Sequence, residues 1–311
     1  MKVAITGISG GIGTGLTKKL LSDPDLEKII GIDIRPPKIH HPKIEFHNLC
    51  VSSPQLREII PDERPDTLVH LAWMVSQNHN QKKEYRTDVL GSQNVLKACS
   101  EVGVRNAIVT STGKVYGMRV TNSHIDRFTE ESPLVAEKQL TYVKHKILLE
   151  QMCADFAQQH PETSLTVFRP CTVLGEHIDT PITRSMKNKI TSLMDYNPER
   201  QFVDEEDVVA TIYMAITQPR PGVFNIASDT TVPQRKLHQH ANKPHREILS
   251  WMAEVVLDAG FKLHLSKINS QALSYLKHSI VISNGKLKRE FPYKPKFTTE
   301  QVLERFGELT N

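Results

Sequence analysis

The stretch that decides the fold stands at the start of this 311-residue chain: Lys2-Val-Ala-Ile-Thr-Gly-Ile-Ser-Gly-Gly-Ile-Gly13. It is a short apolar strand that runs into a glycine-rich turn and then into a helix. Gly7 permits the tight bend, and Gly13 lets the helix pack close to the strand. Gly10 or Gly11 lets the backbone approach a pyrophosphate, which the unpaired N–H groups of the helix N-terminus also face. The turn therefore predicts a dinucleotide site.

An acidic residue completes this pattern. The next apolar strand, Lys28-Ile-Ile-Gly-Ile-Asp33, ends in a carboxylate twenty residues after Gly13 (33 minus 13). A carboxylate there accepts hydrogen bonds from the adenosine ribose and repels the 2′-phosphate of NADP, so we expect NAD as the cofactor. Arg35 lies on the same side of the extended strand. It either pairs with a 2′-phosphate, which keeps NADP as the alternative, or forms a surface salt link to Asp33.

Composition excludes several classes of protein. The 39 basic and 35 acidic residues are mixed along the chain, and the net charge of +4 is mild, so we expect no nucleic acid partner. The four cysteines stand far apart, which indicates neither a disulfide framework nor a zinc site and favours a reducing cytoplasm. No apolar run approaches the ~18 residues of a membrane span, and the N-terminal run is too short for a signal peptide. We expect a cytoplasmic protein without a membrane partner.

Strand and helix patterns alternate through residues 1–170. The expected strands are 2–6, 28–34, 67–71, 106–110 and 165–168, and the expected helices are 11–21, 54–60, 84–102 and 136–159. Such alternation predicts an α/β fold with a Rossmann-type, doubly wound parallel sheet. We assign residues 1–170 to the NAD(P)-binding domain, with returning elements at about 201–227.

The remaining segments, 171–200 and 228–311, are predicted to form a smaller substrate-binding cap. After residue 170 the expected elements are a helical stretch at 181–194, a strand at 201–203, helices at 205–217 and 246–259, and a strand at 222–227, of which those between about 201 and 227 return to the first domain. Residues 229–246 form a polar, histidine-rich loop with few side chains suited to a core, so this loop is our candidate for disorder.

Three residues form the predicted catalytic group. Tyr142 and Lys146 lie four apart on the long helix, so both side chains project from one face. A free tyrosine has a pKa of about 10, but an ammonium and a nicotinium charge favour the phenolate and make the residue a usable base. Thr112 follows the strand at 106–110, whose carboxyl end borders the crevice where doubly wound sheets bind ligands.

With these pieces the chain resembles the extended branch of the short-chain dehydrogenase/reductase superfamily, the NAD-dependent epimerase/dehydratase family. The resemblance covers nearly the whole chain. It is carried by Thr6-Gly-Ile-Ser-Gly-Gly-Ile-Gly13, Val69-His-Leu-Ala72, Asp88-Val-Leu-Gly-Ser-Gln-Asn94, Ser111-Thr-Gly-Lys-Val-Tyr-Gly117, Tyr142-x-x-x-Lys146, Arg169-Pro-Cys-Thr-Val-Leu-Gly175, Phe202-Val-Asp-Glu-Glu-Asp-Val208 and Phe291-Pro-Tyr-Lys-Pro-Lys-Phe-Thr298.

The resemblance implies roles for individual residues. Thr112 holds the substrate oxygen, Tyr142 is the acid/base, and Lys146 also binds the nicotinamide ribose. It implies a homodimer formed through the helices at 84–102 and 136–159. The implied cofactor contacts are Gly7, Ser9, Gly10, Gly11, Ile12, Gly13, Asp33, Ile34, Arg35, Asn48, Leu49, Leu71, Ala72, Trp73, Tyr142, Lys146, Pro170, Thr172 and Val173.

Departures from the family pattern narrow the expected chemistry. The sugar-nucleotide dehydratases have Asp and Glu after the threonine, where this chain has Gly113 and Lys114, so we do not expect a 4,6-dehydratase. Thr172 replaces the asparagine with which many sugar-nucleotide enzymes contact their ligand, and this puts a nucleotide-sugar substrate in question. Asp88 stands where the family often has Asn, which alters the surroundings of Lys146.

The cap loop carries His238, His240 and His245 among basic residues. We expect no metal there, because a His-x-His pair without a carboxylate is a poor ligand set. Our hypothesis is instead that Arg235, Lys236 and Arg246 close over an anionic substrate. Near the nucleotide turn, Trp73 and Met74 either line the substrate pocket or pack beneath the cap.

The sequence is consistent with three functions. The first is an enzyme that moves hydride between NAD and a secondary alcohol carbon, such as that of a sugar or nucleotide sugar, as an epimerase does. The second is a plain alcohol or hydroxysteroid-type dehydrogenase. The third is a non-catalytic NAD(P)-sensing protein, against which the presence of Thr112, Tyr142 and Lys146 counts.

Overall fold

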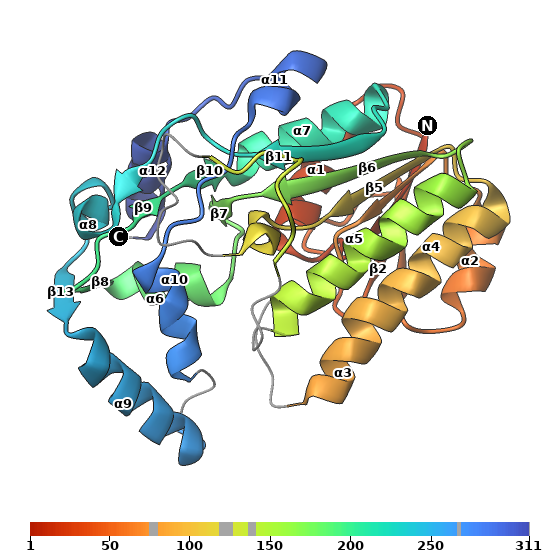
Figure 1. Cartoon of the computed structure of the whole chain (residues 1–311). Coiled ribbons are helices and arrows are strands. Elements are labelled where there is room, and N and C mark those ends of the chain that lie inside the picture. The colour runs from red at the N-terminus through yellow and green to blue at the C-terminus, as the bar shows by residue number, and fades with distance from the viewer. Residues whose placement is uncertain (75–79, 118–126, 136–140, 266–268, 311) are drawn as a thin grey trace.

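The computed structural model describes residues 1–74, 80–117, 127–135, 141–265 and 269–310. Its centre is a seven-stranded sheet in the order β11-β6-β5-β4-β1-β2-β3, in which every neighbouring pair is parallel (Figure 1). The strands are β1 (Lys2–Thr6), β2 (Lys28–Asp33), β3 (Ile44–Asn48), β4 (Thr67–His70), β5 (Asn106–Thr110), β6 (Ser164–Pro170) and β11 (Gly222–Ile226). The predicted Rossmann-type α/β fold is confirmed.

Alternation along the strands fills two cores. Val3 and Ile5 of β1 face one side, together with apolar residues of α1 (Gly11–Leu21) and α7 (Glu205–Thr217). Ala4 faces the other side, where the helices are α2 (Leu56–Glu63), α4 (Gly91–Val102) and α5 (Thr141–Gln159). Successive side chains of a strand point to opposite faces, so a strand that is apolar throughout requires both layers.

The strand order indicates where a ligand would bind. The chain winds outward from β1 to β2 and β3, and then returns to the other side of β1 as β4. Ligands of such sheets bind beyond the carboxyl ends of the strands at this point of reversal. The glycine turn after β1, Asp33 at the end of β2 and the segment after β4 all lie at that edge.

The cap is built from small elements around a core of its own. Three two-stranded sheets pair β10 with β7, β12 with β9, and β13 with β8. These strands are β7 (Thr172–Leu174), β8 (Ile190–Leu193), β9 (Glu199–Arg200), β10 (Phe202–Asp204), β12 (Val232–Pro233) and β13 (His245–Ile248). The cap and C-terminal helices are α6 (Pro181–Asn188), α8 (Leu237–His240), α9 (Ser250–Lys262), α10 (Ser274–Lys277), α11 (Gly285–Glu290) and α12 (Thr299–Thr310).

The loop that we expected to be disordered is folded. Within residues 229–246, Val232, Leu237 and Ala241 are buried in a core that includes Phe306 of α12. Their contacts come from helices and strands far away in the sequence, and the histidines and lysines between them mask the pattern. One apolar residue at every fourth or fifth position can anchor a segment in a core when a distant helix supplies the other apolar side chains.

Several other boundaries differ from expectation. The predicted helix at 181–194 ends at Asn188, and residues 190–193 continue as β8, which pairs with β13. The predicted helix at 246–259 therefore begins only at Ser250. β3, an edge strand with half-exposed side chains, was not predicted at all.

The predicted helix at 84–102 is divided into α3 (Gln81–Tyr85), a π-helical turn (Arg86–Leu90) and α4. The expected start of the long helix, 136–140, lies outside the described residues. Among the described residues, no helix combines the length and apolar character needed to cross a membrane.

Candidate functional site

The glycine turn has no room for a side chain at Gly7, Gly11 or Gly13. Gly7 has φ +78°, and a Cβ on it would lie 2.6 Å from the backbone N of Ala72. A Cβ on Gly13 would lie 2.3 Å from the carbonyl oxygen of Gly7. α1 begins at Gly11, so the N–H groups of Gly11, Ile12 and Gly13 belong to its first turn and point out of the helix end. This is the geometry that cradles a pyrophosphate.

Asp33 is fixed beside the turn by backbone donors. The N–H of Ser9 donates to its Oδ2 at 3.2 Å, and the N–H of Arg35 donates to its Oδ1 at 3.1 Å. Ser9 Oγ in turn donates to the carbonyl oxygen of Arg35 at 2.6 Å. Ile34 and Arg35 are exposed next to it. The carboxylate thus faces the edge where a ribose would lie.

The predicted adenine contacts lie at the same edge. Asn48 is paired with Asp33 across β2 and β3, and the N–H of Leu49 donates to the carbonyl oxygen of Asp33 at 3.1 Å. Leu71 and Ala72 come directly after β4, and the N–H of Ala72 lies 3.4 Å from the Thr6 hydroxyl. The structure therefore brings the first half of the predicted cofactor residues together.

Thr112 and Tyr142 meet at the end of β5. The Thr112 hydroxyl acts on the Tyr142 phenol, whose ionised form it favours, and Thr112 Oγ1 accepts from the N–H of Lys114 at 3.3 Å. Burial raises the pKa of Tyr142 to about 12, a rise to which the charge of Asp88 adds and which the Thr112 hydroxyl opposes. In the absence of a cofactor, Tyr142 is a neutral phenol.

Lys146 lies one helical turn along from Tyr142. Its Nζ donates to the carbonyl oxygen of Thr110 at 2.6 Å. Burial lowers the pKa of Lys146 to about 7, although the carboxylates of Asp88 and Glu150 favour its charged form. The ammonium therefore titrates near neutral pH.

Trp73 lies beside both catalytic candidates. Lys146 Nζ is 3.5 Å from the centroid of its ring, and the Tyr142 ring meets it edge to face at 6.3 Å. The indole Nε1 is buried without a hydrogen-bond partner. The structure thus places Trp73 at the catalytic pair, where the resemblance had implied only a cofactor contact.

A buried contact between Asp88 and His145 was missed by the sequence analysis. Asp88 Oδ2 lies 3.2 Å from Nδ1 of His145, and Asp88 Oδ1 accepts from the N–H of Met74 at 3.0 Å. Asp88 comes from the π-helical turn and His145 from α5, next to Lys146. The replacement of the family's Asn by Asp88 was the only sign of it in the sequence.

Lys114 lies near Tyr142, and the charge of a second cation, Arg200, acts on Lys114. Lys114 Nζ is 5.8 Å from the centroid of the Tyr142 ring, and its pKa is lowered to about 8, first by burial and then by the charge of Arg200. Burial also lowers the pKa of Arg200 to about 9. Its Nε donates to Gln234 Oε1 at 2.6 Å and its Nη1 to the carbonyl oxygen of His278 at 3.1 Å, but the buried Nη2 has no partner.

Arg200 was not among the predicted site residues. Its place two residues before the Phe202–Val208 segment was the available signal. A buried guanidinium nitrogen without a hydrogen-bond partner among the described residues is unfavourable, and an anionic group would satisfy it. The arrangement favours a ligand with a negatively charged group near Arg200.

The cap residues predicted to touch the cofactor lie between the sheet and the glycine turn. Pro170 ends β6, and Thr172 and Val173 belong to β7, which pairs with β10. The segment after β7 reaches the turn itself, since a Cβ on Gly11 would lie 2.5 Å from the carbonyl oxygen of His177. The predicted residues of both halves thus surround one edge of the sheet.

Arg235 of the cap loop is engaged elsewhere. Arg235 donates to the carbonyl oxygen of Met194, and its Nε lies 3.4 Å from Glu247. His238 and His245 stack at 4.1 Å, and His245 Nε2 lies 2.9 Å from Ser192 Oγ. In the structure Arg200, and not Arg235, is the guanidinium next to Lys114.

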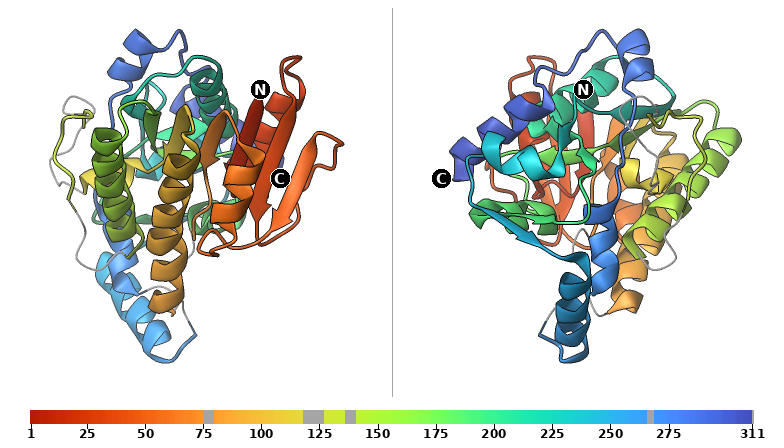
Figure 2. Two further views of the ribbon diagram at one scale, coloured as in Figure 1. Left: turned by 90° about the vertical axis from the view of Figure 1, so that its right-hand side faces the viewer. Right: turned by 60° about the vertical axis from the view of Figure 1, so that its left-hand side comes forward.

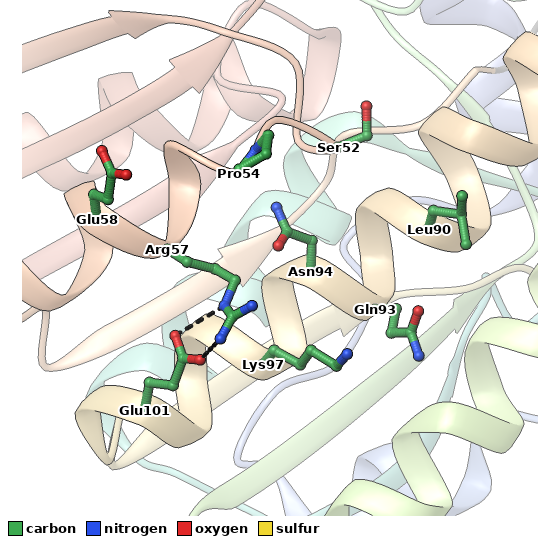
Figure 3. A pocket seen from close by; sticks show the side chains of 9 residues that line it. All are labelled: Ser52, Pro54, Arg57, Glu58, Leu90, Gln93, Asn94, Lys97 and Glu101. Carbon is green, nitrogen blue, oxygen red and sulfur yellow. Dashed lines mark hydrogen bonds and ion pairs between the residues drawn. The ribbon is translucent and has the colours of Figure 1, made fainter.

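Two other features of the described residues lie apart from this edge. Glu45, His47 and Glu63 group possible metal ligands, but Lys28 Nζ already lies 2.6 and 2.8 Å from the two carboxylates. Figure 3 shows an open hollow over α2 and α4, in which Arg57 and Glu101 point toward one another as an ion pair. None of the predicted catalytic residues lines it.

Comparison with known proteins agrees with this geometry. The family model described as "NAD dependent epimerase/dehydratase family" matches residues 3–227. The chain belongs to that family. The expected resemblance is confirmed, and with it the expectation of NAD as the family's cofactor.

Curated relatives are distant. Rv0501, an uncharacterized protein of Mycobacterium tuberculosis, is 22% identical over 98% of this chain and 82% of its own length. The dTDP-6-deoxy-L-talose 4-dehydrogenase (NAD(+)) of Aggregatibacter actinomycetemcomitans is 26% identical over 73% of this chain and 84% of its own.

Solved structures share the fold. UDP-glucose 4-epimerase of Thermotoga maritima, solved with UDP-glucose, has a TM-score of 0.79 at 19% identity, covering 99% of this chain and 98% of its own. The dTDP-glucose 4,6-dehydratase of Bacillus anthracis, solved with NAD, has a TM-score of 0.76 at 19% identity, covering 99% and 96%. Epimerases and dehydratases both occur among the neighbours, so the fold alone does not exclude dehydration.

Proposed function

We propose that this protein moves a hydride between NAD and a secondary alcohol carbon of a small substrate that bears an anionic group, with Tyr142 as the acid/base. The observation that carries the proposal is the meeting of Tyr142 and Lys146 around Trp73, at 6.3 and 3.5 Å from its ring, beside the carboxyl end of β5, where Lys146 Nζ donates to the carbonyl oxygen of Thr110. Thr112 would hold the reacting oxygen, and Tyr142 would take its proton as hydride leaves the carbon.

The electrostatics explain why the pair needs its cofactor. In the free protein Lys146, with a pKa of about 7, loses its proton before Tyr142, with a pKa of about 12. A phenolate next to an ammonium is therefore not the stable state of the free site. NAD supplies the hydride acceptor, and its positively charged ring favours the phenolate of Tyr142. Proton abstraction would thus begin only after NAD has bound.

The proposed anionic group follows from Lys114 and Arg200. A phosphate near Arg200 Nη2 would satisfy a buried guanidinium nitrogen that has no hydrogen-bond partner among the described residues. A nucleotide sugar fits this requirement, and the UDP-glucose epimerase neighbour is solved with such a ligand. Thr172, in place of an asparagine, supports a smaller anionic or plain alcohol substrate as the second candidate.

Among the family's reactions we favour epimerisation or oxidation over dehydration. Loss of water needs an acid and a base beyond the tyrosine, and Gly113 and Lys114 supply neither carboxylate. We also retain the division into a domain of residues 1–170 and a cap of 171–200 and 228–311, and a homodimer through α4 and α5, as proposals. Light scattering that reports a monomer at working concentration would rule out the dimer.

The experiment that tests the function is a screen of the purified protein with NAD against nucleotide sugars, free sugars and secondary alcohols. NADH formation is followed by absorbance, and the stereochemistry of the product is determined in parallel. Net NADH identifies a dehydrogenase, whereas an inverted product without net NADH identifies an epimerase.

The variant Tyr142→Phe tests the assigned acid/base. We expect kcat to fall by about 10²- to 10⁴-fold, while NAD binding measured by calorimetry stays within about twofold. Tyr213→Phe is the matched control, because the hydroxyl of Tyr213 bonds Asp23 far from the site. Full activity in Tyr142→Phe would remove this residue from the mechanism.

A further inference from the structure

Exposed apolar side chains are concentrated on one helix of the cap. Half of the large apolar residues that are exposed in the described part of the chain lie on α9 or directly beside it. They are Leu249 (37% exposed), Trp251 (60%), Met252 (47%), Val255 (61%), Val256 (69%), Leu263 (68%) and Leu265 (84%). Contiguous apolar surface of this kind marks a contact site.

The exposed residues form a continuous stripe. Trp251 and Val255, like Met252 and Val256, are four apart and therefore lie on one side of the helix. The opposite side holds the helix to the cap, where Ala253 and Leu257 pack with Leu193. α9 is thus attached by one apolar face and leaves a second apolar face uncovered.

The charges of α9 are divided in the same way. Glu254 pairs with Lys277, and Asp258 accepts from the N–H of Ser270 at 2.9 Å, so both carboxylates have partners within the chain, and the charge of Lys262 also acts on Asp258. Between residues 249 and 265 the exposed positions include no carboxylate. The ionisable residues among them are Lys262 and His264, so the uncovered face is apolar with a basic end.

Figures 1 and 2 show α9 projecting from the body of the molecule as a convex ridge. Its 13 residues correspond to a length of about 20 Å. A helix of this length does not span a bilayer but can lie in the interface between headgroups and acyl chains. Tryptophan side chains are enriched at this interface, and lysine side chains are attracted to anionic headgroups.

We propose that α9 and residues 263–265 dock this protein on the surface of a lipid bilayer that contains anionic lipids. The apolar stripe would enter the headgroup region, and Lys262 would contact the lipid phosphates. The active domain would then be held beside the membrane without crossing it. This revises our expectation from the sequence that there is no membrane partner, which rested on the absence of a long apolar run.

A second copy of the chain fits the ridge less well. Two convex ridges meet along a line, whereas a stable protein contact covers about 800 Å² on each partner. Such a contact also needs hydrogen-bonding groups at its rim, and here both carboxylates of α9 are already bonded within the chain. An anionic lipid surface requires neither this contact area nor a rim of hydrogen-bonding groups.

The test uses the full chain and vesicles of phosphatidylcholine, with or without phosphatidylglycerol. We expect the protein to sediment with the anionic vesicles and much less with the neutral ones. Val255→Glu and Val256→Glu should each weaken partitioning by about tenfold or more, because each places a carboxylate where an apolar side chain would be buried. Leu309→Glu on α12 is the matched control, since Leu309 is 52% exposed outside this face.

A second measurement reports the depth of the helix. The chain has two tryptophans, so in a Trp73→Phe background the fluorescence comes from Trp251 alone. We expect a blue shift on addition of anionic vesicles, which Val256→Glu removes. Absence of sedimentation and of a blue shift in the folded protein would overturn the proposal. A concentration-dependent oligomer that Val256→Glu dissociates, without vesicle binding, would equally overturn it and assign the face to a second copy.

Discussion

The two sides of the candidate site are formed by different chemical groups. On the cofactor side, contacts are made by main-chain groups: the glycine turn, the N–H groups that hold Asp33, and the ends of β1 and β4. On the substrate side, buried side chains such as Lys114 and Arg200 provide the chemistry. The backbone around Gly7 and Gly13 leaves no room for an added atom. A charged side chain, in contrast, can be exchanged without loss of the fold. Mutations on the two sides should therefore have different effects.

The largest effect is expected from an added methyl group in the turn. Gly13→Ala places a Cβ 2.3 Å from the carbonyl oxygen of Gly7, so the backbone must shift. We expect a loss of about 3 kcal/mol in the free energy of unfolding, measured by denaturant titration, and a loss of NAD binding. Gly10→Ala is the control, because its Cβ would meet its nearest atom at 3.2 Å and should cost less than about 1 kcal/mol. Equal effects of the two variants would contradict the assigned geometry.

On the substrate side, Arg200→Gln should separate binding of substrate from binding of NAD. Loss of the guanidinium removes charge-assisted hydrogen bonds to an anion, so we expect KM to rise by about 10- to 100-fold while calorimetry shows unchanged NAD affinity. Arg235→Gln is the matched variant, because Arg235 is engaged by Met194 and Glu247. We expect it to change KM by less than about threefold. A larger effect of Arg235→Gln would restore the hypothesis that the cap loop closes over the substrate.

The smallest effect concerns the residue between the two sides. The Asp88 carboxylate favours the ammonium of Lys146 and raises the pKa of Tyr142. In Asp88→Asn both pKa values should fall, so the pH profile of kcat/KM should move to lower pH by about one unit. Asp155→Asn, on the exposed side of α5, is the control and should leave the profile in place. A shift to higher pH would assign Asp88 a different role.

The cofactor side could be predicted because its signals are local. The glycine turn, Asp33 and the Tyr142/Lys146 pair depend on spacings within one strand, turn or helix. Arg200 could not be found in this way, since its meaning depends on Lys114 and Gln234 from other segments. The Asp88–His145 pair joins the π-helical turn to α5. The spacing of apolar residues in the sequence does not distinguish a π-helical turn from an α-helix, so this pair could not be predicted.

The same limit explains the errors in the cap. Residues 190–193 and 245–248 are too short to be identified as strands until they pair with each other. Val232, Leu237 and Ala241 become a core only against Phe306, about seventy residues away (306 minus 237). The α9 stripe, in contrast, was visible as a helix, but its exposure was not, because the sequence does not say which of two apolar faces is covered.

The segment that follows β7 links the cap to the nucleotide turn. The carbonyl of His177 lies against Gly11, and His177 is itself held by Glu205 at the start of α7 through its N–H at 3.0 Å and its Nδ1 at 2.8 Å. The first turn of α1, which carries the N–H groups of the glycine turn, is therefore joined through one loop residue to the start of α7. Two helix ends that lie almost two hundred residues apart in the sequence (205 minus 11) thus meet through a single side-chain contact.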